Sequence, residues 1–182
     1  GDGMIFQQFL NEDSGCLSYL IGCGDAGEAI VVDPGRDRVN EYLRFASKKG
    51  MKITRVVETH THADHISGGE VFADTARVVA HENARRAIIA EKRPTAVPQV
   101  TFNDRMMIEL GGTAVELSYV GRNHSDNSIV MRFPRERLHV TLLAAEHPER
   151  VAGAVFIGAS VPLTARSAER TVFGSFDDVL ES

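Results

Sequence analysis

The first half of the chain consists of short apolar runs broken by turn-forming residues, with one longer amphipathic stretch among them. The apolar runs are rich in β-branched and aromatic residues and predict strands at residues 4–10, 16–23 and 28–35. Over residues 38–50 the apolar positions Val39, Tyr42, Leu43 and Phe45 form a helical stripe that ends in Lys-Lys-Gly. The next apolar run, 52–59, is expected to form a buried strand that leads directly to His60.

The middle of the chain continues this alternation of strand and helix patterns. A short helix is expected after Gly68-Gly69, then a strand at 76–82 and a helix at 83–92. A loop follows, marked by two prolines, and three successive apolar patterns then predict strands at 105–110, 114–120 and 128–134. Strands interleaved with helices in this way indicate an α/β fold with a mixed sheet.

The pattern changes near Leu138. Residues 138–163 suggest an Ala/Leu-rich helix, a turn at His147-Pro148 and an apolar strand, whereas residues 164–182 are polar and weakly patterned. We therefore expect a core over residues 1–138 and a tail over residues 139–182 that serves packing or oligomerisation.

Composition narrows the class of partner. The 182 residues are 43% hydrophobic, which is enough for a sizeable core, and the net charge is −5. An acidic chain without a long Lys/Arg block is not expected to bind nucleic acid or an anionic membrane. We expect no signal peptide, two reduced cysteines at Cys16 and Cys23, and a cytoplasmic protein that acts on a small molecule.

One heptapeptide concentrates the candidate chemistry. The stretch THTHADH, residues 59–65, holds three of the seven histidines together with Asp64. His60 and His62 are two residues apart, so an extended backbone directs both imidazoles to one side. Imidazole and carboxylate together suit zinc, iron and similar ions. A surface loop that is merely rich in histidine is a much poorer explanation of this spacing at the end of an apolar strand.

The heptapeptide resembles the H-x-H-x-D-H signature of the metallo-β-lactamase superfamily. The upstream VVDPG, with Asp33, and the downstream GRNHSDNS, with His124, also match, and the resemblance covers about residues 4–138. It implies an αββα sandwich in which His60, His62 and His124 bind one metal and leave a position for water. Asp64 and His65 would serve a second metal, or Asp64 would act on the water as the catalytic proton acceptor.

The chain departs from that family in its last quarter. A bridging Asp on a later strand and a His near the C-terminus are both expected, yet no aspartate lies between Asp126 and Asp177. Instead, residues 142–163 resemble a helix and strand of α/β-hydrolases without their nucleophile motif. We therefore expect a truncated αββα sandwich with a non-family helix–strand tail, as in a chimera of two fragments. A sandwich that cannot close its own core is expected to form a homodimer or larger oligomer.

Several residues near the cluster have other expected roles. Asp33 is expected to orient the cluster loop by hydrogen bonds instead of binding metal. His81 lies between a strand and a helix, where a capping or surface role is favoured. Ser125, Asp126 and Asn127 either line the site beside His124 or simply form a polar turn between strands.

Three functions are compatible with these residues. The favoured one is a metal-dependent hydrolase that uses a metal-activated water on an ester, lactone, lactam or phosphoester, with low selectivity because covering elements are missing. It would hold one or two zinc ions per chain, with Fe2+ or Mn2+ as alternatives. The second is an iron-dependent persulfide dioxygenase, which residues 14–68 resemble most. The third is a non-catalytic metal-binding scaffold.

Overall fold

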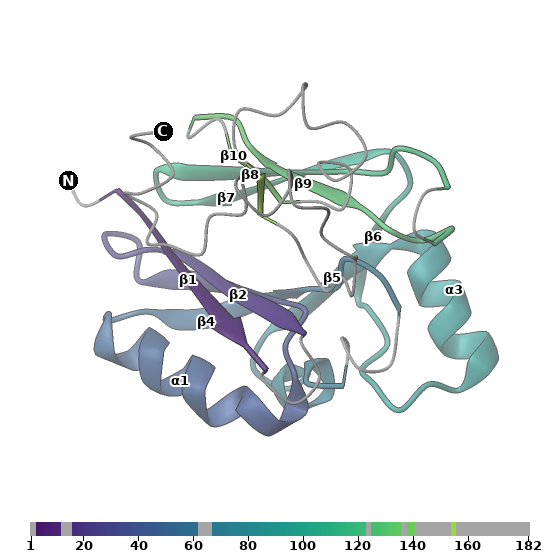
Figure 1. Cartoon of the computed structure of the whole chain (residues 1–182), viewed down its shortest axis with the longest axis horizontal. Helices are drawn as coiled ribbons and strands as arrows, with labels where there is room; N and C mark the ends of the chain where they lie inside the picture. Colours follow the sequence, from purple (N-terminus) through teal and green to yellow (C-terminus); the bar gives the residue numbers. More distant parts are fainter. Residues whose placement is uncertain are drawn as a thin grey trace, which may run out of the picture.

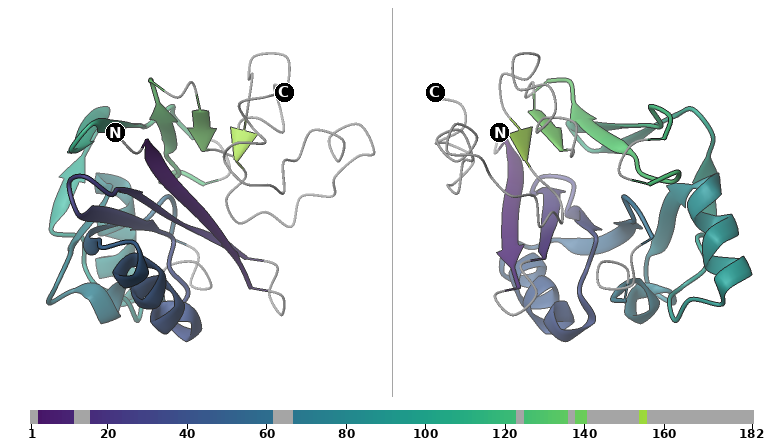
Figure 2. Two further views of the ribbon diagram at one scale, coloured as in Figure 1. Left: turned by 90° about the vertical axis from the view of Figure 1, so that its left-hand side faces the viewer. Right: turned by 45° about the vertical axis from the view of Figure 1, so that its right-hand side comes forward.

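The computed structural model describes residues 3–11, 16–61, 67–122, 125–135, 138–140 and 154–155. Two β-sheets pack face to face, and a helix covers the outer face of the first sheet (Figure 1). Figure 2 shows the same layers from two other sides. The molecule is therefore a layered sandwich over the described residues.

The first sheet is mixed, and its described strands follow the order β1-β2-β3-β4-β5-β6. Their bounds are Met4–Leu10, Leu17–Cys23, Glu28–Val32, Lys52–Val57, Arg77–His81 and Val100–Phe102. The first three strands pair antiparallel, whereas β3 to β6 are parallel to one another. The carboxyl ends of β3, β4 and β5 therefore meet at one edge of the sheet.

The second sheet is mostly antiparallel, in the described order β11-β10-β9-β8-β7. From β7 to β11 the bounds are Arg105–Leu110, Thr113–Ser118, Val130–Phe133, Leu138–Val140 and Ala154–Val155. The strand β10 pairs antiparallel with β9 and parallel with β11. Residues 138–140, which were expected to open a helix, are thus a strand, because they extend the sheet from β9.

Helix α1 (Val39–Lys48) packs on the first sheet through Val39, Tyr42 and Ala46. The predicted stripe was wrong at Leu43, which is 46% exposed. The buried face of the helix continues instead from Tyr42 to Ala46, one turn later. Helix α3 (Glu82–Glu91) follows β5 directly. Two 3-10 turns complete the described helical elements: η1 (Arg36–Arg38) precedes α1, and η2 (Gly69–Phe72) follows the heptapeptide.

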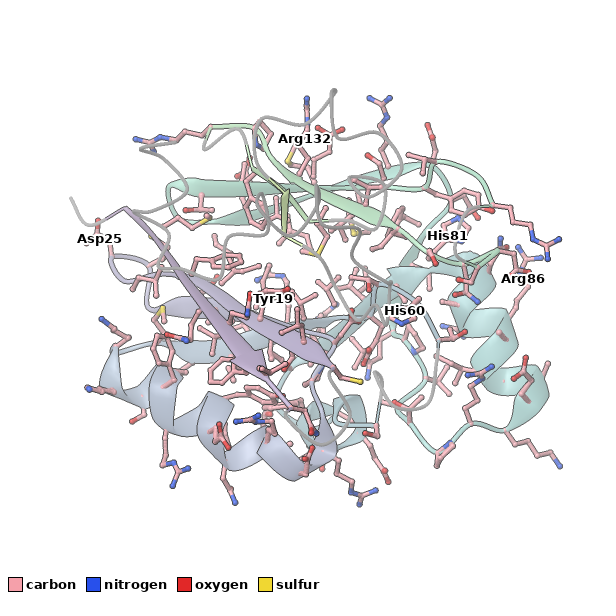
Figure 3. The ribbon with its side chains drawn as sticks, viewed as in Figure 1. Tyr19, Asp25, His60, His81, Arg86 and Arg132 are labelled. Atoms are coloured by element: carbon pink, nitrogen blue, oxygen red, sulfur yellow. The ribbon has the colours of Figure 1, made fainter. Side chains whose placement is uncertain are left out.

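Apolar side chains fill the space between the two sheets. Alternate residues of β8, among them Val115 and Leu117, face inward and meet Tyr19 and Ile21 of β2. Figure 3 shows Tyr19 between the two sheets. A second core, including Leu20 and Val56, lies between the first sheet and α1. Successive side chains of a strand point to opposite faces of the sheet, which explains how β2 contributes to both cores.

The architecture confirms the predicted fold class, with the tail mostly outside the described residues. Strand β6 was not predicted, because three residues after Pro98 carry no readable periodicity, and it forms by parallel pairing with β5. Cys16 and Cys23 are not joined in a disulfide. Within the described ranges, no helix has the length and apolar character needed to cross a membrane.

Candidate metal centre

Functional side chains collect at the carboxyl edge of the parallel strands. Asp33 follows β3, His60 follows β4, and His81 ends β5. Backbone bonds continue past the strands, from Asp33 N to the Val57 carbonyl and from Glu58 N to the Val79 carbonyl, both 3.0 Å. Figure 3 shows His60 and His81 in the half of the molecule opposite Asp25. This edge is where open α/β sheets commonly bind ligands.

His60 is held in one orientation by a chain of two hydrogen bonds. Its ring is only 2% exposed, and its Nδ1 lies 2.9 Å from Thr59 Oγ1. The Thr59 hydroxyl donates its single hydrogen to Asp33 Oδ2, so toward the ring it can only accept. His60 Nδ1 therefore carries the proton, as assigned from this network, and Nε2 holds the lone pair. That tautomer is the form in which imidazole binds metal through Nε2.

Asp33 is the residue that fixes this arrangement. Its Oδ1 also accepts the Thr59 N–H at 2.7 Å, so one carboxylate holds both the backbone and the side chain of Thr59. Asp33 has a φ of 46°, a left-handed conformation that Asp tolerates better than most residues with a side chain. Burial raises the pKa of this carboxyl group to about 7. The predicted hydrogen bonds between Asp33 and the cluster loop are present, through Thr59.

His81 has a structural role, as predicted. Its Nδ1 accepts the Asn83 N–H at 3.1 Å and so caps α3, while Nε2 donates to the Asn103 carbonyl at 2.9 Å. The ring also stacks on Tyr119 with centroids 4.0 Å apart. Because both ring nitrogens are engaged in hydrogen bonds, His81 is not a candidate ligand.

The segment that follows His124 lies against the segment that contains His60. Ile129 N donates to the Thr59 carbonyl at 2.9 Å, and Asn127 Nδ2 donates to Thr61 Oγ1 at 2.9 Å. Asn127 is 4% exposed. Residues 127–129 and 59–61 are thus in contact, although Asn127 and Thr61 are 66 positions apart in the sequence. Asn127 therefore contacts the described start of the heptapeptide, while His124 lies outside the described residues.

Two features of this edge were not predicted from the sequence. Glu58 is 1% exposed, and burial followed by the proximity of Asp33 raises its pKa well above the usual range. The loop after the heptapeptide packs closely on its surroundings through Gly68 and Gly69. A Cβ at Gly68 would overlap the Pro34 carbonyl oxygen, and one at Gly69 would lie 2.5 Å from Glu58 Oε1. The sequence shows the pair of glycines, but it does not show that they pack against Pro34 and Glu58.

Four of the predicted ligands, His62, Asp64, His65 and His124, lie outside the described residues. Within the described ranges no group of three His, Cys, Asp or Glu side chains is placed to hold a metal. The described part nevertheless fits a metal, because His60 presents the correct ring nitrogen and its neighbours fix it. Nitrogen donors of this kind suit zinc and iron alike.

Comparison with known proteins agrees with this geometry. Over 74 residues the chain is 40% identical to a hydroxyacylglutathione hydrolase of Nitrosococcus oceani, a match that covers 40% of this chain and 27% of that protein. Over 72 residues it is 31% identical to the mitochondrial persulfide dioxygenase ETHE1 of Mus musculus, covering 40% and 28% of the two chains. The matches therefore span little more than a quarter of each of these two relatives.

Solved structures extend the similarity to the whole sandwich. A metallo-beta-lactamase from Staphylococcus aureus superposes with a TM-score of 0.60 at 27% identity, covering 74% of this chain and 38% of that one. The sequence profile of the Metallo-beta-lactamase superfamily matches residues 11–145, most of the chain. The fold and the placement of His60 agree with this match. The chain therefore belongs to the metallo-β-lactamase superfamily.

Proposed function

We propose that this protein is a metal-dependent hydrolase whose first metal is held by His60, His62 and His124. The observation that carries the proposal is the Asp33–Thr59–His60 chain, which sets the imidazole tautomer for metal binding. A relative that is a hydrolase supports the same reaction type. Zinc is the favoured ion, with one or two per chain and Fe2+ or Mn2+ as alternatives.

His60, His62 and His124 would hold the zinc, which when bound would supply a Lewis acid and lower the pKa of a bound water to about 7. The contribution of the chain is to hold and orient groups around it. Asp33 and Thr59 keep the His60 ring fixed, so that it does not have to reorient when metal binds. Asp64 is proposed to accept a proton from the attacking water or to orient it. Esters, lactones, lactams and phosphoesters are the proposed substrate classes, and discrimination among them is expected to be weak.

The test combines metal content with turnover. Purified protein should contain close to one zinc or more per chain and should hydrolyse some members of a panel of chromogenic esters, phosphoesters and lactams. The variant His60→Ala should lose both metal and turnover, since it removes a ligand. His81→Ala is the matched control: the same residue type at the same edge, expected to lower stability but to keep metal content.

The second candidate function, an iron-dependent persulfide dioxygenase, rests on the similarity to ETHE1. It predicts iron in the protein and oxygen uptake with glutathione persulfide, whereas zinc without oxygen uptake argues against it. The third, a non-catalytic scaffold, predicts that metal binds but that no panel substrate is turned over. Hydrolysis that survives both His60→Ala and Asp64→Ala would exclude the cluster as the catalytic site.

Assembly and location are part of the proposal as well. We also propose that the chain forms a homodimer or larger oligomer, with the tail exchanged or shared between copies, and that it is cytoplasmic. In the described part of the second sheet, the outward-facing Glu109 and Arg132 are exposed and charged, and the apolar Met107 on the same face is 52% exposed. Sedimentation over a range of concentrations measures the assembly, and a constant monomer mass would contradict it.

A further inference from the structure

Asn127 connects the two chain segments that carry the proposed ligands of the first metal. It lies three residues after His124, and its Nδ2 donates to Oγ1 of Thr61, which lies between His60 and His62. The donor–acceptor distance is 2.9 Å, and the two residues are only 4% and 3% exposed. A buried hydrogen bond with no competing solvent has a well-defined geometry, so the bond sets the spacing between the two segments.

The amide of Asn127 is fixed in one orientation. Asp126 Oδ1, a carboxylate oxygen that accepts, lies 3.3 Å from Asn127 Nδ2, which assigns that end of the amide as the NH2 that also faces Thr61, and Ser125 Oγ donates to Oδ1 at 2.9 Å. Ser128 Oγ lies 2.6 Å from Ser125 Oγ and completes the turn. The direction of the Asn127–Thr61 bond therefore follows from its surroundings and not from a free choice of amide flip.

The turn itself is anchored to helix α3 and to Tyr119, the residue after strand β8. The Asp126 carbonyl accepts hydrogen bonds from Tyr119 Oη at 3.0 Å and from Asn83 Nδ2 at 2.8 Å. Tyr119 in turn stacks on the capping residue His81. Asn127 thus projects from a turn that is held in place independently of Thr61.

Thr61 is held from its other side as well. The Arg93 guanidinium donates to the Thr61 carbonyl and also pairs with Glu91, with 2.6 Å between Nη2 and Oε2. The backbone of the His60–His62 segment is therefore restrained by Arg93, and its side chain by Asn127. Together with Asp33 on Thr59, both neighbours of His60 in the sequence are fixed.

We propose that Asn127 is a positioning residue that holds the His124 segment at the correct distance from the His60–His62 segment before metal binds. The inference rests on the proposed metal site. Ligands that are already in place lose less conformational freedom on binding, and groups that orient ligands typically change metal affinity 10–100-fold. Removing either partner of the Asn127–Thr61 bond should therefore weaken the binding of zinc by that factor.

The experiment measures the zinc dissociation constant of the full chain by competition with a chromogenic chelator. Asn127→Ala and Thr61→Val should each bind zinc 10–100-fold more weakly than the natural sequence. The double variant should be about as weak as either single variant, because both changes remove the same bond. Thr61→Ser keeps the hydroxyl and should bind normally, as should Asn103→Ala, a matched change at an exposed asparagine.

Unfolding of the metal-free variants and the visible spectrum of the Co2+-loaded protein separate positioning from general stability. A positioning role predicts altered Co2+ ligand-field bands in Asn127→Ala and recovery of the natural spectrum in Thr61→Ser. Variants that are less stable yet bind zinc within twofold of the natural sequence, with an unchanged Co2+ spectrum, would overturn the inference. If Asn127→Ala does not fold, the nearly isosteric Thr61→Val decides by the same criteria. A natural sequence that binds no zinc, iron or manganese would instead refute the proposed metal site.

Discussion

Asp33 and Glu116 are both carboxylates on the sandwich, but their surroundings shift their pKa values in opposite directions. Asp33 lies buried at the end of β3, where loss of solvent raises its pKa to about 7 despite two bonds from Thr59. Glu116 lies on the outer face of β8, where the Arg132 guanidinium 2.6 Å away lowers its pKa. Figure 3 shows Arg132 on the side of the second sheet that faces away from the first.

The difference indicates what each region contributes. Burying Asp33 costs folding free energy, but the buried carboxylate holds Thr59 in place and sets the tautomer of His60. Glu116 and Arg132 form an ion pair in which the Arg132 side chain is 48% exposed and the Glu116 side chain 13%, and such a pair near solvent contributes little to either stability or chemistry. The carboxyl edge of the first sheet is therefore organised for a site, whereas the outer face of the second sheet interacts with solvent.

The largest expected effect comes from Asp33→Ala. It leaves the Thr59 N–H and hydroxyl without their buried acceptor, which should lower the free energy of unfolding by roughly 2–4 kcal/mol. Zinc affinity should fall about 10–100-fold as well, because the His60 ring is no longer oriented. Urea unfolding of the metal-free protein and chelator competition measure the two effects.

A second substitution at the same position separates the two effects. Asp33→Asn keeps an oxygen acceptor for the Thr59 N–H but places an NH2 group against the Thr59 hydroxyl. The hydroxyl must then donate its hydrogen to His60 Nδ1, which changes the tautomer of the His60 ring. Stability should fall less than in Asp33→Ala, while zinc binding should fall by a similar factor. Zinc binding at the natural affinity in Asp33→Asn would contradict the role assigned to this carboxylate.

The next effect tests the packing that surrounds the site. Gly68→Ala would force a Cβ against the Pro34 carbonyl oxygen, in the loop directly after Asp33. Because Gly68 has an ordinary φ of −85°, the cost is steric and should be about 1–3 kcal/mol. Gly3→Ala is the matched control, since a Cβ there meets no atom within 4 Å. Equal unfolding midpoints for the two variants would show that the loop relaxes freely.

The smallest expected effect is on the outer face of the second sheet. Glu116→Gln should lower the free energy of unfolding at pH 7 by about 0.5 kcal/mol, because Arg132 is half exposed. The folded pKa of Glu116 is lowered, so its stabilisation is present above the unfolded value of about 4.3 and is lost as the pH falls through the folded pKa. The difference between the two proteins should therefore disappear in acid.

Urea titrations at pH 7 and near pH 3 measure this difference, and Glu109→Gln on the neighbouring strand is the control. If Glu116→Gln lowered the free energy of unfolding at pH 7 as much as Asp33→Ala does, the contrast between the two regions would be wrong. The same titrations in high salt should reduce the effect of Glu116→Gln, since exposed pairs are screened.

Much of the fold could be predicted from local pattern. Alternating or continuous apolar runs predicted most of the strands, and a Gly-ended amphipathic stretch predicted α1. The exceptions depend on partners in space. Strand β6 exists because it pairs with β5, Leu138–Val140 form a strand because β9 and β11 flank them, and Leu43 is exposed although it follows a buried Tyr42.

The sequence by itself determined the chemistry of the candidate site and the family. The spacing in THTHADH, the aspartate of VVDPG and the capping position of His81 were all readable, because these roles depend on residue type and local geometry. Only the tertiary structure decided which residues hold the ligands in place. The Asn127–Thr61 bond and the contact of Gly68 with Pro34 join segments that are distant along the chain. Glu58 is buried because those segments pack around it. No local pattern encodes such contacts, since they arise only when the two sheets and their loops have packed together.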